Sequence, residues 1–151
     1  MALAAGSDAP DFGLLATPDQ KVSLSEFHGP VVLIFYPADW SPVCSDELSM
    51  FSAAQKMFHA RGAQLLGISV DGPWCHEVFK EQRNVAFPLL ADCNPKGDVA
   101  KSYGVYRDDD GTSERALFVI DSNGKIVWSE VSPVGVNPGA DGALRAVEAL
   151  S

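Results

Sequence analysis

Cys44 is the residue of this chain whose surroundings best suit a nucleophile. It follows an apolar segment and a short loop that begins at Pro37. We expect a helix to begin at Ser41 and Pro42, because serine is favoured at the N-cap and proline at the next position. Cys44 then lies in the first turn, where unpaired N–H groups and the helix dipole stabilise a thiolate. The thiolate is the reactive form of cysteine, so the spacing predicts a nucleophile; a small buried hydrophobe is the alternative.

Acidic residues near Cys44 in the sequence require a cation. Asp39, Asp46 and Glu47 would raise the pKa of the thiol and oppose the effect of the helix. The chain has 11 lysines and arginines, and Arg115 interrupts an otherwise apolar strand pattern. Its planar guanidinium can hold a thiolate and substrate oxygens together. Arg115 is therefore a candidate to complete the site; a solvated strand end is the alternative.

The spacing of Pro37, Ser41 and Cys44 resembles the peroxidatic-cysteine motif of the peroxiredoxins, Pro-x-x-x-Thr/Ser-x-x-Cys, with serine where most members have threonine. Further stretches that resemble the family are Ala9-Pro10-Asp11-Phe12, Ser69-Val70-Asp71, residues 87–92, Tyr103-Gly104-Val105 and Phe118-Val119-Ile120-Asp121. The resemblance covers nearly the whole chain. It implies a thiol-dependent peroxidase whose cysteine thiolate attacks the O–O bond of hydrogen peroxide or an organic hydroperoxide and becomes a sulfenic acid.

The resemblance also implies roles for the residues around the cysteine. Pro37 would shield the sulfur from water, and Arg115 would be the active-site arginine. The Ser41 hydroxyl would accept from a backbone amide and donate to the sulfur or the peroxide. Glu47 would help to hold the arginine, and Trp40 would serve packing rather than chemistry.

A thiol must then reduce the sulfenic acid. Two-cysteine relatives have a second cysteine in a C-terminal extension or one turn after the first; here the chain ends at Ser151 without it, and Ser49 occupies the other place. The sequence is therefore most similar to the one-cysteine bacterial alkyl-hydroperoxidase branch. This implies an external reductant, which is thioredoxin, glutaredoxin or a low-molecular-weight thiol, and a homodimer. Cys75 and Cys93 are candidates for an internal resolving cysteine, with ordinary packing as the alternative for both.

Two other functions use the same residues. Trp40 to Cys44 is similar to the Trp-Cys-x-x-Cys motif of thioredoxin-like disulfide oxidoreductases, but Ser41 stands where the attacking cysteine would be. The second alternative is a redox sensor that uses the sulfenic acid of Cys44 as a signal. Reduction of insulin tests the first alternative, and turnover of peroxide with dithiothreitol tests the second.

The composition predicts one domain that covers residues 1–151. The chain is 46% hydrophobic and 21% charged, which suits one hydrophobic core. A net charge of −9 without a basic cluster disfavours nucleic acid and anionic membranes as partners. The longest apolar run, residues 31–36, is much shorter than the roughly 20 residues of a membrane span. Residues 1–6 lack the basic and apolar regions of a signal peptide, so we expect a cytoplasmic protein.

The chain shows no metal-binding pattern. It has three cysteines and three histidines: Cys44, Cys75, Cys93, His28, His59 and His76. An odd number of cysteines at unrelated spacings does not suit a disulfide framework, and neither set has the spacing of zinc ligands. We expect neither a metal nor an organic cofactor.

The apolar patterns predict the elements that position Cys44. Strands are predicted at residues 31–36, 63–70, 87–91, 115–121 and 125–131, helices after Ser41, after Gly72, at 95–103 and around Leu144 and Val147, and a hairpin around Pro18-Asp19. This order is typical of a thioredoxin-like α/β fold, with a central mixed sheet flanked by helices and an N-terminal hairpin. In open α/β sheets, sites lie beyond the carboxyl ends of the strands, where the loop before Cys44 is expected.

Two of the predicted helices carry apolar residues. The helix after Ser41 has Leu48, Phe51, Ala54 and Phe58 on one face, and the helix after Gly72 carries Trp74, Val78 and Phe79. Apolar faces of this kind are normally buried against a sheet. We expect the helix after Ser41 to run the length of the domain and to lie in a right-handed β-α-β unit.

Overall fold

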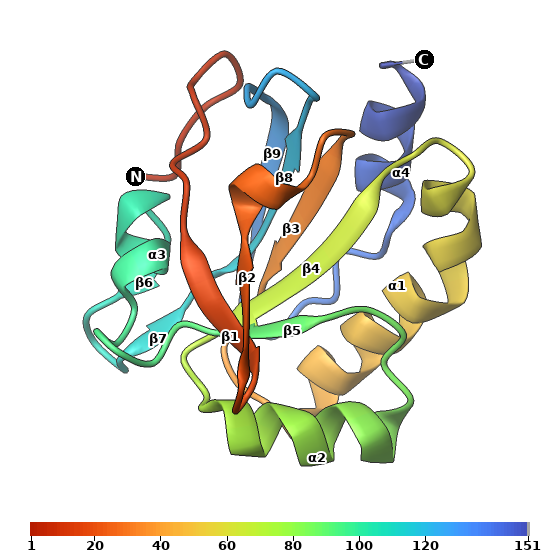
Figure 1. Cartoon of the computed structure of the whole chain (residues 1–151). Helices are drawn as coiled ribbons and strands as arrows, with labels where there is room; N and C mark the ends of the chain where they lie inside the picture. Colours follow the sequence, from red (N-terminus) through yellow and green to blue (C-terminus); the bar gives the residue numbers. More distant parts are fainter. Residues whose placement is uncertain (151) are drawn as a thin grey trace.

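A mixed β-sheet lies at the centre of the molecule (Figure 1). The computed structural model describes residues 1–150, and within them the sheet has seven strands in the order β2-β1-β5-β4-β3-β8-β9. The strands are β1 (Gly13–Thr17), β2 (Gln20–Ser23), β3 (Val31–Phe35), β4 (Gln64–Ser69), β5 (Leu89–Ala91), β8 (Arg115–Ile120) and β9 (Ile126–Ser132). β3, β4 and β5 are parallel, whereas β8 and β9 continue the sheet in antiparallel fashion. The predicted central mixed sheet is confirmed.

Strand β3 is buried on both faces, as its unbroken apolar sequence predicted. Val32 and Ile34 belong to one layer of the core, and Leu33 and Phe35 belong to the other. Successive side chains of a strand point to opposite faces, so each face receives every second residue. Neither face of β3 contacts water, which explains why it has no polar position.

Helices cover both faces of the sheet (Figure 1). They are α1 (Pro42–His59), α2 (Pro73–Arg83), α3 (Asp98–Ser102) and α4 (Asp141–Glu148), together with the short 3-10 helix η1 (Leu24–Glu26). Helices α1 and α4 pack in the core layer of Val32 and Ile34, and α3 packs in the other layer. The predicted apolar face of α1 is buried along its length, at Leu48, Phe51, Ala54 and Phe58. Within residues 1–150, every helix is too short or too polar to cross a membrane.

Helix α2 buries only one of the three apolar residues that the sequence places on it. Phe79 is buried, but Trp74 and Val78 are 71% and 51% exposed. The helix lies across the lower end of the sheet in Figure 1 and contacts β1 and β5. Its buried residues are His76 and Phe79. The apolar residues therefore lie on both sides of the helix, and hydrophobicity alone did not identify the buried face.

Two hairpins complete the fold. The predicted N-terminal hairpin is present as β1 and β2, and Leu15 joins it to the main sheet by pairing with Ala91 of β5. A second hairpin, β6 (Tyr106–Arg107) and β7 (Thr112–Ser113), encloses the acidic turn at residues 108–111. The helix predicted at residues 95–103 is shorter, because α3 begins only at Asp98.

Candidate active site

Cys44 lies at the amino end of α1, beyond the carboxyl end of β3. Its helix has Ser41 as the N-cap and Pro42 as the first residue, as predicted. The Cys44 side chain is fully buried. The loop at residues 36–41 carries the chain from β3 to α1. The thiol therefore lies in the first helical turn, where the helix dipole favours the anionic form of sulfur.

Strand β8 places Arg115 against this sulfur. β8 runs antiparallel to β3 with Ala116 opposite Phe35, so Arg115 lies beside the start of the loop that follows β3. The Arg115 Nη2 donates to the Cys44 Sγ at 3.3 Å, and the arginine side chain is 1% exposed. A guanidinium in a buried site stabilises an adjacent thiolate relative to the neutral thiol. The two residues are brought together as the sequence analysis expected.

Three further hydrogen bonds, made to two residues, fix the orientation of the guanidinium. Its Nη1 donates to Glu47 Oε1 at 2.8 Å, and its Nε donates to the Val134 carbonyl at 2.9 Å. Nη2 donates to the same carbonyl as well as to the Cys44 sulfur. Glu47 therefore holds Arg115, as the resemblance implied. The segment after β9 supplies a backbone contact that sequence reasoning missed, because a carbonyl leaves no trace in the residue types.

Glu47 is itself perturbed by this position. Burial raises the pKa of its carboxyl to about 7, although the hydrogen bond and the charge of Arg115 lower it. Its second oxygen, Oε2, has no hydrogen-bond partner among residues 1–150. The loss of water around the carboxylate thus outweighs the ion pair, and Glu47 changes charge close to neutral pH.

Ser41 and Pro37 flank the buried sulfur along the chain. Pro37 is half-buried and lies two residues after the end of β3, where it can limit the access of water. Ser41 has the backbone conformation of an N-cap, but its hydroxyl makes no capping hydrogen bond within the described residues. The expectation that a backbone amide donates to this hydroxyl is therefore wrong. The Ser41 carbonyl does accept from the Ser45 amide, as in a regular first helical turn. The hydroxyl remains available to a substrate oxygen.

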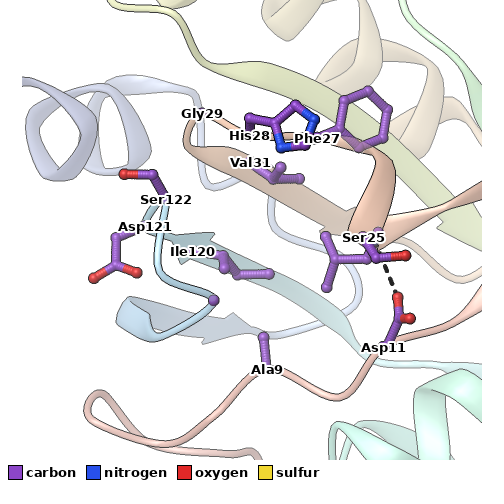
Figure 2. Close-up of a pocket in the computed structure, with 12 residues that line it drawn as sticks. Ala9, Asp11, Ser25, Phe27, His28, Gly29, Val31, Ile120, Asp121 and Ser122 are labelled. Carbon is purple, nitrogen blue, oxygen red and sulfur yellow. Dashed lines mark hydrogen bonds between the residues drawn. The ribbon is translucent and has the colours of Figure 1, made fainter.

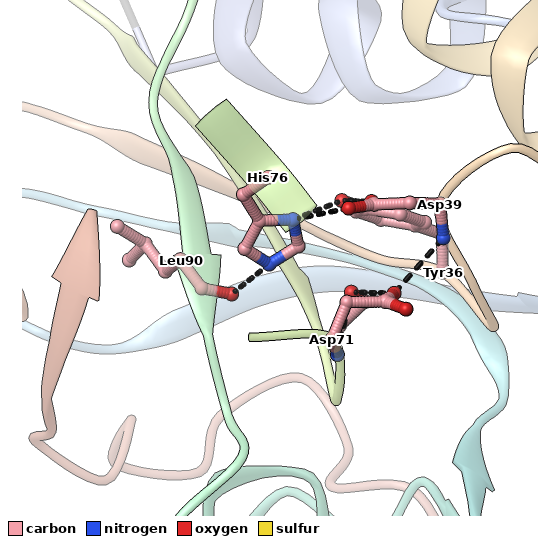
Figure 3. A network of polar contacts seen from close by, with 6 residues as sticks. Tyr36, Asp39, Asp71, His76 and Leu90 are labelled. Atoms are coloured by element: carbon pink, nitrogen blue, oxygen red, sulfur yellow. Dashed lines mark hydrogen bonds and ion pairs between the residues drawn. The ribbon is translucent and has the colours of Figure 1, made fainter. Parts of the chain in front are cut away.

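The other acidic residues do not meet Arg115. Asp46 is exposed, and the buried Asp39 faces His76, whose Nδ1 lies 2.7 Å from Asp39 Oδ2. The Tyr36 hydroxyl donates to the other Asp39 oxygen at 2.7 Å (Figure 3). The expectation that Arg115 compensates the charges of Asp39, Asp46 and Glu47 together was thus wrong. Sequence reasoning missed His76, because the residue is 37 positions from its partner.

Trp40 lies between the site and helix α2. It is 42% exposed, and its ring packs edge-on against Phe79 with 5.1 Å between the ring centroids. Arg83 lies on the same helix as Phe79, and its guanidinium carbon is 5.1 Å from the Trp40 ring centroid. Trp40 therefore serves packing, as expected, and it links the loop before Cys44 to α2.

Cys75 and Cys93 are both half-buried free thiols. The Cys75 sulfur and the carboxylates of Asp39 and Asp71 lie within 4.8 Å of one another. Burial, followed by the hydrogen bond and the charge of Asp39, raises the pKa of the Cys75 thiol to about 11. Cys93 lies just after β5, and its backbone forms an isolated antiparallel β-bridge with Lys96. Cys75 is therefore a weak source of thiolate, since a thiol with this pKa is almost fully protonated at neutral pH.

A pocket of about 380 Å³ lies at the opposite end of β3 (Figure 2). Its lining includes Val31 and Ile120, together with the polar side chains of Asp11, His28 and Asp121. Val31 and Phe35 are the two ends of β3, roughly 13 Å apart at the rise of a strand. This pocket therefore takes no part in the chemistry at Cys44.

Comparison with known proteins places the chain among the peroxidases that this geometry suggests. The family model described as "AhpC/TSA family" matches residues 5–129. A thioredoxin peroxidase of Echinococcus granulosus is 37% identical over 161 residues, covering 99% of this chain and 82% of the relative. Peroxiredoxin-2 of Pongo abelii is 36% identical over 156 residues, covering 96% and 87%.

Solved structures agree with the sequence matches. The crystal structure of peroxidoxin BcpB from Mycobacterium tuberculosis has a TM-score of 0.90 at 33% identity and covers 99% of each chain. The reduced 2-Cys peroxiredoxin of Plasmodium vivax has a TM-score of 0.89 at 31% identity, covering 98% of this chain and 82% of that one. The predicted thioredoxin-like fold is confirmed by these likenesses. The chain belongs to the AhpC/TSA family, the peroxiredoxins, and is a thiol-dependent peroxidase.

Proposed function

We propose that this peroxidase uses the Cys44 thiolate as its nucleophile and that Arg115 and Ser41 orient the peroxide. The observation that carries the proposal is the 3.3 Å contact between Arg115 Nη2 and the buried Cys44 sulfur. In the proposed step, the thiolate attacks one peroxide oxygen and the O–O bond breaks. The sulfur becomes a sulfenic acid, and the second oxygen leaves as water or an alcohol after it takes up a proton.

The guanidinium has a donor left for the peroxide. Arginine carries five N–H groups. Four hydrogen bonds are made, to the Cys44 sulfur, to Glu47 and twice to the Val134 carbonyl. One Nη1 hydrogen therefore has no acceptor within residues 1–150. Together with the Ser41 hydroxyl, it can hold a peroxide oxygen in line with the sulfur, which removes the entropic cost of orientation.

Substitution of each cysteine tests the assignment of the nucleophile. Cys44→Ser should abolish peroxide consumption, whereas Cys75→Ser and Cys93→Ser should leave the first oxidation step intact. The measurement is the rate of peroxide loss under a single turnover with each purified variant. Peroxide loss at the wild-type rate in Cys44→Ser would refute the proposal.

We also propose that an external thiol reduces the sulfenic acid, as in the one-cysteine branch. The pKa of about 11 at Cys75 supports this, because a resolving cysteine attacks as a thiolate. One similar protein is named a thioredoxin peroxidase, which makes thioredoxin a suitable reductant to try beside glutaredoxin and small thiols. Relatives named 2-Cys peroxiredoxins favour the other outcome, a disulfide with Cys75 or Cys93.

Intact mass after one equivalent of peroxide separates these outcomes. A gain of one oxygen that persists until thiol is added supports an external reductant. A loss of two hydrogens within the monomer would show an internal disulfide and overturn this part of the proposal. Peptide mapping then identifies which cysteine pairs with Cys44.

A homodimer and a cytoplasmic location complete the proposal. Trp74 and Val78 expose apolar surface on α2, and exposed apolar surface of this kind is common where subunits meet. The three free cysteines suit a reducing compartment, although one relative from Hordeum vulgare is named chloroplastic. Light scattering tests the dimer, and cell fractionation tests the location.

A further inference from the structure

His76 is a buried side chain that the proposed reaction does not use. It is 1% exposed, with Nδ1 at 2.7 Å from Asp39 Oδ2 and Nε2 at 3.1 Å from the Leu90 carbonyl oxygen (Figure 3). Both ring nitrogens thus lie within hydrogen-bond distance of an oxygen, one on the loop before Cys44 and one on β5. The neighbouring Tyr36 hydroxyl also contacts this pair. His76 and Asp39 therefore form a buried hydrogen-bonded pair between α2 and the loop before Cys44.

The next loop residue, Trp40, needs support from its surroundings. Its φ angle is +71°, in the left-handed region that a residue with a large side chain rarely adopts. Such a conformation persists when neighbouring contacts hold it. Here the contacts are the edge-on packing with Phe79 and the position of the Arg83 guanidinium over the ring.

These contacts come from one strip of one helix. His76, Phe79 and Arg83 are three and seven residues apart, which places them on the same face of α2. The strip holds two consecutive loop residues, Asp39 through its contact with the His76 ring and Trp40 through its own ring. Immediately after Trp40 the chain turns into α1, so the orientation of the first turn of α1 depends on where this strip holds the loop.

We propose that this strip of α2, with His76 as its main member, positions the loop at residues 37–41 and so sets how Cys44 is presented to its substrate. The inference rests on the proposed role of Cys44. His76 does not touch the sulfur and acts through Asp39.

Substitution of each member of the His76–Asp39 pair tests the proposal. The variants are His76→Gln, Asp39→Asn and the double variant, with His59→Gln as a control on the exposed part of α1. His76→Gln should slow the reaction of Cys44 with peroxide about tenfold or more, because small displacements of a reacting group are costly. The double variant should lose less than the product of the two single losses, since both act through one contact. The control should react at the wild-type rate.

Alkylation of Cys44 by iodoacetamide, located by peptide mapping, gives a second measurement. In His76→Gln the loop loses its contact with α2 through Asp39, so alkylation of Cys44 at a fixed pH should be slower than in the wild type. Asp39→Asn should slow it to a similar extent. A residue that only maintains the fold would leave this rate unchanged in the folded variant. A folded His76→Gln variant with both rates unchanged, or a double variant with fully additive losses, overturns the proposal.

The exposed end of the strip provides a test that does not depend on a buried substitution. Arg83→Gln removes the cation over Trp40, whereas Arg83→Lys keeps one. We expect about a two- to fivefold loss of peroxide rate in Arg83→Gln and a smaller loss in Arg83→Lys. If His76→Gln does not fold, wild-type rates in Arg83→Gln overturn the proposal. If the wild type reduces no peroxide but His76→Gln still slows alkylation, the proposed function fails and the positioning role stands.

Discussion

Replacement of Arg115 by alanine perturbs the site most directly. The change removes the 3.3 Å contact to the Cys44 sulfur and the 2.8 Å contact to Glu47. A hydrogen bond to a charged partner contributes about 1.5 to 3 kcal/mol. If the contact to sulfur is made fully in the transition state, this energy corresponds to about a 10- to 150-fold loss in the rate constant for peroxide.

The same substitution also affects stability, and this effect must be separated from reactivity. Without Arg115, the Glu47 carboxyl is buried without its cation, and removal of one member of a buried pair costs about 3 to 5 kcal/mol. Arg115→Ala combined with Glu47→Gln removes both charges and should recover part of the stability. Arg115→Lys keeps a charge but loses the planar fork, so its rate should fall between those of the wild type and the alanine variant.

Two measurements distinguish whether the guanidinium acts on the thiolate or on the peroxide. They are stopped-flow kinetics of peroxide reduction and the pH dependence of Cys44 alkylation. If Arg115 stabilises the thiolate, both rates fall at neutral pH, and the alkylation profile moves to higher pH. If Arg115 acts on the peroxide, only the peroxide rate falls. A folded alanine variant that reduces peroxide at the wild-type rate would refute the reasoning from the Arg115 contact.

Three further predictions follow from single residues. Glu47 has its pKa raised to about 7 in the folded protein from an ordinary 4.5. As pH rises between these values, the unfolded state releases the proton first, so the free energy of unfolding should fall. Urea unfolding measured against pH should show this fall, and Glu47→Gln should reduce it. Ser41→Ala should slow peroxide reduction about tenfold by loss of one hydroxyl donor, whereas Ser41→Thr should retain the rate in stopped-flow assays. Phe51→Ala should cost about 3 to 5 kcal/mol in urea unfolding, because Phe51 is fully buried; exposed Met57→Ala is the control.

The sequence alone determined the features that depend on neighbouring residues. The run of apolar residues predicted β3, and Ser41 with Pro42 predicted the start of α1. The apolar stretches at residues 115–121 and 125–131 predicted the two strands that form the β8-β9 hairpin. Each of these features depends on local backbone conformation or on side-chain periodicity, which a sequence displays directly. The position of Cys44 in a first helical turn followed from the same local rules.

Contacts between distant parts of the chain were decided by the tertiary structure. The register of β3 against β8 brings Arg115 to Cys44 across 71 positions, and resemblance to a family, not spacing, had indicated that meeting. The packing of α2 decides that His76, and not Arg115, contacts the Asp39 carboxyl group. It also leaves Trp74 exposed, because a helix with apolar residues on both sides can bury only one of them against the sheet. Pairings of this kind depend on strand register and helix rotation, which no local pattern specifies.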